Sequence, residues 1–179
     1  MYIGSIDGSL YALDARTGDE QWVTATNAPV FSSPTLLKAA ATVSIVFGSD
    51  DGSIRAVNPD SGEVRWQVDT AAPVFATPAV ADGVVYVGSR DGSFLAIDGS
   101  DGSILWNTFL TEVLSSAAVT DQRVFVGSSD GNMYVLDRAS GEALHALPVG
   151  ALVWTSPSVV DGYLFFGAHD DNIHAYALP

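Results

Sequence analysis

A six-residue segment recurs five times along this chain, and its spacing restricts the fold more than any other feature of the sequence. Each copy starts with a glycine and ends with a serine or asparagine, and the copies begin at Gly4, Gly48, Gly88, Gly127 and Gly167. The intervals between them are 44, 40, 39 and 40 residues. A period near 40 residues is typical of repeat proteins, in which each unit buries its apolar surface against its neighbours.

Every segment within a unit has the pattern of a β-strand. Polar and apolar residues alternate, or a short apolar run occurs, and no stretch keeps a sustained helical period. In the third unit the predicted strands are 74–80, 84–89, 93–98 and 104–109. Four antiparallel strands per unit predict an all-β fold, a β-propeller of four-stranded blades with about 4.5 repeats of about 40 residues.

The turns between the predicted strands support this register. Asp82-Gly83 and Asp91-Gly92 link successive strands, and Asp-Gly is typical of tight hairpins because glycine adopts a positive φ without a steric clash. In the fifth unit Asp171 occupies the glycine position. Proline has no N–H to donate and is confined to sheet edges. The first strand of a unit is therefore predicted to be an edge strand, because prolines recur there at Pro34, Pro78 and Pro157.

Residues 1–179 are predicted to form a single domain of five units, at approximately 1–28, 29–72, 73–111, 112–151 and 152–179. The first unit starts at its second strand and the last one ends after its third, so the sequence predicts a partial propeller. An incomplete ring leaves unpaired strand edges, which are prone to pair with another chain. We therefore expect the open ends to favour self-association.

A second motif follows the third strand of the first four units, where a glycine precedes a tryptophan, or in one unit a histidine, by four residues. The pairs are Gly18 and Trp22, Gly62 and Trp66, Gly102 and Trp106, and, with histidine in place of tryptophan, Gly141 and His145. The motif resembles the tryptophan-docking motif of the pyrroloquinoline-quinone (PQQ)-type propeller repeats. These repeats occur in quinoprotein dehydrogenases and in the outer-membrane assembly lipoprotein of Gram-negative bacteria, and the resemblance covers essentially the whole chain.

The resemblance implies a structural role for these residues. Each tryptophan is expected to be mostly buried and to stack on the backbone near the motif glycine of the next blade, where the missing side chain permits close approach. The joint formed by His145 is expected to be weaker. By resemblance alone, the parent protein is also expected to be periplasmic or otherwise extracytoplasmic, although residues 1–5 do not resemble a secretion signal.

The charge of the chain excludes some partners. Seven basic residues, one of them a lysine, stand against 21 acidic residues, which gives a formal net charge of −14. Such a surface repels phosphate backbones and anionic lipid, so we expect no nucleic-acid partner. The apolar runs are far shorter than the roughly 20 residues of a membrane-spanning helix.

The resemblance also implies what a quinoprotein enzyme would need, namely a carboxylate base, calcium ligands and, in many members, adjacent cysteines. The chain has no cysteine, and its three histidines are not clustered. Glu20, Glu63 and Glu142 fall in turns after the motif glycine, while Glu112 lies near an inner strand without a second acid. The aspartate-glycine segments are typical of turns rather than of a calcium loop. The sequence predicts no catalytic, cofactor-binding or metal-binding residue.

Large apolar residues occupy one further position, at the start of the first strand: Phe31, Phe75, Leu114 and Trp154. Each is followed by a pair of small residues. Strand alternation favours packing of these large side chains between blades. The alternative is an apolar ring at one mouth of the propeller, and the four residues are then a candidate inner-strand surface.

These observations favour a non-catalytic repeat module that acts as a protein-interaction or scaffolding surface, with a protein as its partner. The alternative is a fragment of a PQQ-dependent alcohol or sugar dehydrogenase whose PQQ and calcium ligands lie outside this chain.

Overall fold

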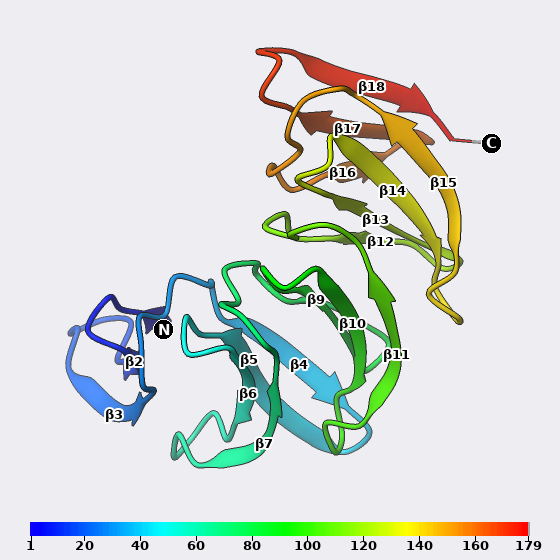
Figure 1. The fold of residues 1–179 in the computed structure, drawn as a ribbon. Helices are drawn as coiled ribbons and strands as arrows, with labels where there is room; N and C mark the ends of the chain where they lie inside the picture. The colour runs from blue at the N-terminus through cyan, green and yellow to red at the C-terminus, as the bar shows by residue number, and fades with distance from the viewer. Residues whose placement is uncertain (179) are drawn as a thin grey trace.

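The computed structural model describes residues 1–178, which form five antiparallel sheets and no helix. Figure 1 shows the sheets following one another along an open arc, with the first and last sheets at its two ends. The prediction of an all-β propeller with antiparallel blades is confirmed. The three middle blades have four strands and the two terminal blades have three. Within the described residues no helix is long and apolar enough to span a membrane.

The blades are numbered 1 to 5 along the chain. Blade 1 consists of β1 (Tyr2–Gly4), β2 (Ser9–Leu13) and β3 (Glu20–Ala25). Blade 2 consists of β4 (Thr35–Ala39), β5 (Thr42–Gly48), β6 (Ser53–Val57) and β7 (Val64–Asp69). Blade 3 consists of β8 (Ala79–Ala81), β9 (Val84–Gly88), β10 (Ser93–Asp98) and β11 (Ile104–Phe109). Blade 4 consists of β12 (Ala118–Val119), β13 (Arg123–Gly127), β14 (Asn132–Asp137) and β15 (Ala143–Pro148). Blade 5 consists of β16 (Ser158–Val160), β17 (Tyr163–Gly167) and β18 (Ile173–Ala177).

The strands of each blade pair in chain order, so the first strand lies at a sheet edge, as the prolines predict. This strand is shorter than expected in blade 3, where β8 covers Ala79–Ala81 instead of 74–80. The preceding backbone bonds to other blades and not to β9. Val74 N–H donates to the Ser49 carbonyl of blade 2 at 3.1 Å, and Thr77 N–H donates to Ser116 Oγ at 3.1 Å. Residues 74–78 therefore connect blades instead of extending the sheet.

The aspartates of the recurring turns hold the backbone in place. The Asp51 carboxylate accepts hydrogen bonds from Ser53 N–H at 3.0 Å and from Asn27 N–H at 3.1 Å, and Asn27 lies in the loop between blades 1 and 2. Asp91 binds Ser93 N–H and Ala71 N–H in the same way, at 2.7 and 2.8 Å. Part of the acidic composition therefore has a structural cause.

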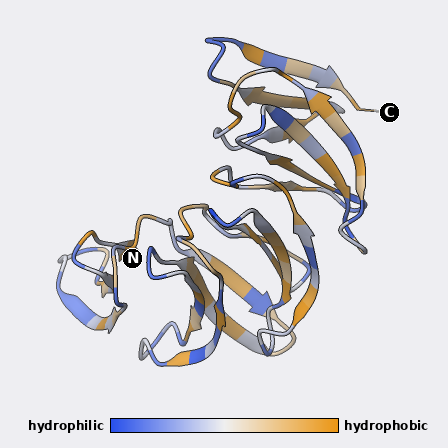
Figure 2. Cartoon of the chain, viewed as in Figure 1, coloured by the Kyte–Doolittle hydropathy of each residue, from blue (hydrophilic) through white to orange (hydrophobic). Residues whose placement is uncertain are grey.

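The core lies between the blades. Val46 and Ile54 of blade 2 pack against Val85, Val87 and Leu95 of blade 3, and equivalent clusters fill the other joints. We call the side of a blade that faces the following blade its forward face, and the opposite side its backward face. Figure 2 shows hydrophobic and hydrophilic residues alternating along the outer strands, as expected where only one side of a strand is covered.

Candidate functional site

The tryptophans of the recurring motif lie across the joints between blades. A Cβ atom added to Gly102 would lie 3.0 Å from Cβ and Cγ of Trp66, so the indole occupies the space that a side chain would take. The same contact joins Trp22 to Gly62 and Trp106 to Gly141. Each indole N–H also donates to a backbone carbonyl of the next blade at 3.0 Å: Trp22 to Pro59, Trp66 to Gly99 and Trp106 to Arg138.

The burial of these indoles differs from one joint to the next. Trp66 is 8% exposed, and Trp22 and Trp106 are more accessible but still have most of their surface covered, as the sequence predicts. Trp106 is more accessible because it forms one wall of an open pocket between blades 3 and 4. All three indoles are therefore mostly buried, and Trp66 is the most completely covered of them.

The two remaining motif positions have no docking contact in the described part of the chain. No atom lies within 4 Å of a Cβ added to Gly18, because no tryptophan of another blade reaches it within the described residues. His145 is exposed on β15, and the structure places Tyr176 and Leu178 beside it in an apolar hollow. Whether the joint at His145 is weaker stays a prediction.

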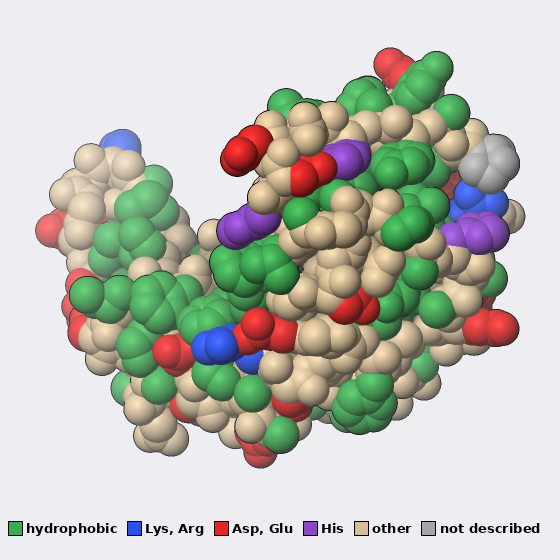
Figure 3. Space-filling view, turned by 45° about the horizontal axis from the view of Figure 1, so that its top comes forward, with side chains coloured by type: hydrophobic (Ala, Val, Ile, Leu, Met, Phe, Trp, Pro, Cys, Tyr) green, Lys and Arg blue, Asp and Glu red, His purple; other side chains and the backbone are tan. Residues whose placement is uncertain are grey.

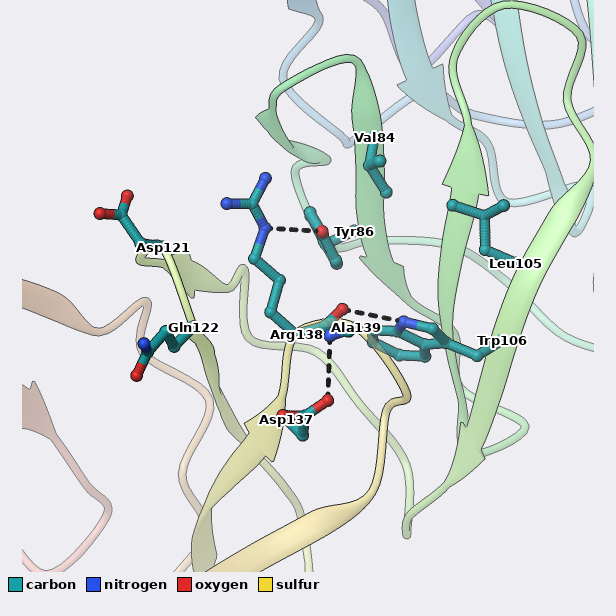
Figure 4. A pocket seen from close by; sticks show the side chains of 9 residues that line it. All are labelled: Val84, Tyr86, Leu105, Trp106, Asp121, Gln122, Asp137, Arg138 and Ala139. Carbon is teal, nitrogen blue, oxygen red and sulfur yellow. Dashed lines mark hydrogen bonds between the residues drawn. The ribbon is translucent and has the colours of Figure 1, made fainter.

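The pocket beside Trp106 is built around Arg138 and has a volume of about 540 Å³ (Figure 4). Arg138 Nε donates to the Tyr86 hydroxyl at 3.0 Å, and its Nη2 lies 2.7 Å from a carboxylate oxygen of Asp82. The bond to Tyr86, followed by that to Asp82, raises the pKa of Arg138 above its ordinary value. These contacts join blade 4 to blade 3, so the pocket is first of all a structural joint. Sequence reasoning missed Arg138, because the equivalent positions in the other blades hold no charged residue.

The four large residues of the candidate inner-strand surface do not form the core. Phe31 is 56% and Trp154 38% exposed, so the interpretation as packing between blades is wrong for these two residues, while Phe75 and Leu114 are partly buried. The preceding residue fills the joint instead, and it is a valine each time: Val30, Val74, Val113 and Val153. A Cβ added to Gly48 would clash with Val74 Cγ1, which shows how closely this valine covers the glycine. Because neighbours on an extended segment point to opposite sides, the following residue faces solvent.

Charged and polar side chains surround these apolar residues. The Phe31 and Phe75 rings lie 5.6 Å apart, and the Arg90 guanidinium lies over Phe75 at 5.6 Å while it forms an ion pair with Glu112. The set of Phe31, Phe75, Arg90, Glu112, Leu114, Trp154 and His169 is called the loop-end surface below.

The second part of the loop-end surface is centred on Trp154. Its ring meets His169 edge-on at a centroid distance of 4.5 Å, and its N–H donates to Ser129 Oγ at 2.9 Å. Arg90, Ser129 and His169 all occupy the third position of the recurring six-residue segment, where the sequence varies between blades. Variable turn residues and large apolar residues therefore share one end of the blades. Figure 3 shows hydrophobic side chains beside acidic, basic and histidine side chains on an exposed face of the molecule.

The titratable groups of the turns are engaged in local bonds. Burial acts to raise the pKa of Asp51, but hydrogen bonds from Ser53 and Arg55 outweigh it and lower this pKa to about 2. A hydrogen bond to Asp130 raises the pKa of Tyr134 to about 12. Among residues 1–178, no three His, Asp or Glu side chains gather in a way that could hold a metal ion. Glu112, the glutamate nearest an inner strand, is paired with Arg90.

Comparison with known proteins identifies the family. A family model described as "Outer membrane protein assembly factor BamB" matches residues 50–178, which is more than half of the chain. This chain belongs to the BamB family. The resemblance to PQQ-type propeller repeats is thereby confirmed. A search of the curated proteins finds no match.

Solved structures of low sequence identity share the BamB-type fold. BamB from Moraxella catarrhalis aligns with a TM-score of 0.83 at 19% identity, over 99% of this chain and 55% of that one. Sqt1 from Saccharomyces cerevisiae aligns with a TM-score of 0.84 at 18% identity, over 98% of this chain and 54% of that one. The computationally designed Ika4 protein aligns over 91% of this chain and all of its own, with a TM-score of 0.72 at 20% identity. The chain thus spans about half the length of BamB and Sqt1.

Proposed function

We propose that this chain is a non-catalytic propeller module whose loop-end surface binds a protein partner. The observation that carries the proposal is the exposure of Phe31 and Trp154 at a position where the fold needs no large side chain. The adjacent valines already fill the joints between blades. Exposed aromatic residues flanked by charged groups are typical anchors of protein interfaces.

The charges of the loop-end surface favour one kind of partner. Arg90 is neutralised by Glu112, and the whole chain carries a net charge of −14. A partner segment that carries an apolar side chain between basic ones would contact the exposed aromatic residues and would be attracted by the net negative charge of this chain. The family description supports a component of the outer-membrane assembly machinery as the partner, and an extracytoplasmic location for the parent protein.

Site-specific photo-crosslinking tests this proposal. A photoreactive phenylalanine analogue replaces Phe31 in one variant and Trp154 in another, and both are expressed in the cells that produce the protein. We expect both positions to crosslink to the same protein. Ile104 is the control, because it is 52% exposed and apolar but lies on the outer strand β11, away from the loop-end surface. An identical crosslinking pattern at Ile104, or none at Phe31 and Trp154, would contradict the proposal.

We also propose that the chain binds neither PQQ nor calcium. The carboxylates that could serve as ligands are engaged, since Asp51 and Asp91 hold turn backbone and Glu112 pairs with Arg90. Reconstitution with PQQ and calcium, followed by gel filtration and a dye-linked alcohol and glucose oxidation assay, tests this. Stoichiometric binding with turnover would instead support the dehydrogenase alternative.

A further inference from the structure

Asp50 carries a carboxylate that has no partner in the described part of the chain. Among residues 1–178, two buried side-chain atoms lack a hydrogen-bond partner, Asp50 Oδ1 and Arg55 Nη1. Arg55 still bonds through its other nitrogens, to Gln67 and Asp51. Asp50 forms no ion pair with any described residue. A buried carboxylate oxygen without a donor is costly, so a donor from another molecule is favoured at this place.

The position of Asp50 in the repeat places it at the loop-end surface. Asp50 occupies the third position of its six-residue segment, as Arg90 and His169 do in theirs. Each of these residues donates its backbone N–H to a carbonyl two places before one of the large apolar residues. The three bonds join Asp50 to Pro29 at 2.9 Å, Arg90 to Pro73 at 3.0 Å and His169 to Leu152 at 3.0 Å. The Arg90 side chain lies over Phe75, so the equivalent neighbour of Asp50 is Phe31.

A hollow beside Asp50 is large enough for the end of a partner side chain. It has a volume of about 180 Å³ and lies between the turn at 50–52 and the connection at 70–73. One water molecule takes about 30 Å³ of liquid volume, so the hollow has room for a charged head group. Apolar residues of the connection form part of its wall. The neighbouring carboxylate of Asp51 is paired with Arg55, so Asp50 supplies the free charge.

We propose that Asp50 binds a basic side chain of the partner segment, beside the apolar side chain that contacts Phe31 and Phe75. This inference rests on the proposed function, and it assigns the charge preference of the loop-end surface to one residue. Lysine and arginine fit because their apolar stems cover the apolar wall of the hollow while their charged head groups donate to the carboxylate. Arg90 and Glu112 neutralise each other, so neither replaces Asp50 in this role. An acidic segment would meet an unpaired carboxylate and is disfavoured.

Selection from a library of displayed random peptides tests this preference directly. The purified wild-type chain should enrich peptides that carry a lysine or arginine next to a large apolar residue. Asp50→Asn should still enrich the apolar residue but lose the preference for the basic one. Asp60→Asn is the matched control and should select like the wild type. Asp60 is exposed in the turn between β6 and β7, at the opposite end of the blade from the loop-end surface.

A double-mutant cycle then measures the contact. The most enriched peptide, and the same peptide with norleucine in place of its basic residue, are titrated by fluorescence anisotropy against the wild type and Asp50→Asn. The wild type should bind the basic peptide about tenfold more tightly than the norleucine peptide, whereas Asp50→Asn should bind the two equally. Thermal unfolding checks that the variant is folded. This is expected because Asp50 Oδ1 has no hydrogen bond to lose.

The results separate failure of this inference from failure of the proposed function. If Asp50→Asn keeps the preference for a basic residue, or discriminates between the two peptides as the wild type does, the role of Asp50 is wrong. If no peptide is enriched, or if Phe31→Ser leaves peptide binding unchanged, the proposed function fails together with this inference.

Discussion

The indole of Trp66 is the residue-scale feature that holds two blades together most directly. It is 8% exposed, it covers Gly102, and it donates to the Gly99 carbonyl at 3.0 Å. We expect Trp66→Ala to lower the free energy of unfolding by about 3 to 5 kcal/mol, because it leaves a cavity and an unpaired carbonyl. Urea denaturation measures the change. A loss below about 1 kcal/mol would mean that the joint does not depend on this side chain.

The carboxylate of Asp51 predicts part of the response to acid. Its side chain is 9% exposed, it lies 2.8 Å from Arg55 Nη2, and its pKa in the folded chain is about 2. Because this pKa lies below the unfolded value near 3.9, the stabilisation is complete above pH 4 and is lost as the pH falls towards 2. The linked free energy is about 2 kcal/mol.

Denaturation of the wild type and of Asp51→Asn between pH 2 and pH 5 tests this expectation. The wild type should be the more stable of the two at pH 5, and the difference should shrink as the pH falls. A difference that stays constant across this range would show that Asp51 does not titrate in the way its contacts predict.

At the residue scale, the sequence did not show which side chain of one short segment is buried. Alternation requires that Val74 and Phe75 point to opposite sides, but it does not say which one is buried. We expected the larger side chain inside, whereas the close approach to Gly48 admits only the valine. The sequence did contain a signal for the buried residue. The first residue of this pair is valine in all four units, whereas the second varies among Phe, Leu and Trp. A side chain confined between two backbones tolerates less variation than one in solvent.

At the scale of elements, the hairpins and the order of the strands could be predicted because each turn has a characteristic sequence. The short first strands could not, because their backbone bonds to neighbouring blades depend on the curvature of the whole arc. Thr77 N–H, for example, donates to Ser116 of the next blade. The role of Arg138 could not be predicted either, because this arginine has no equivalent in the other blades and its partners Asp82 and Tyr86 are more than 50 residues away in the sequence.

Arg138 provides an element-scale prediction because it connects blades 3 and 4. Its side chain is 14% exposed and donates to Tyr86, Asp82 and the Thr120 carbonyl. We expect Arg138→Ala to lower the free energy of unfolding by about 1 to 2 kcal/mol, since three hydrogen bonds are lost but Asp82 remains hydrated. Arg16→Ala, at an exposed arginine of blade 1, should change it by less than about 0.5 kcal/mol. Equal losses for both variants would contradict the role of Arg138.

At the scale of the whole molecule, the repeat predicted a partial propeller, and the structure is an open arc of five blades. What the repeat could not predict is which surface is free. The four large apolar residues of the loop-end surface were found from the sequence, but their exposure and their contacts with Arg90 and His169 required the structure.

The most direct test of the binding role is the affinity of the loop-end surface for the partner found by crosslinking, measured by calorimetry for the wild type and for a Phe31→Ser, Trp154→Ser double variant. Removing two interface anchors should weaken binding about 100-fold, while the free energy of unfolding changes by less than about 1 kcal/mol, because the valines carry the core. Unchanged affinity would contradict the account. A loss of several kcal/mol of stability would also contradict it, because these side chains would then belong to the core.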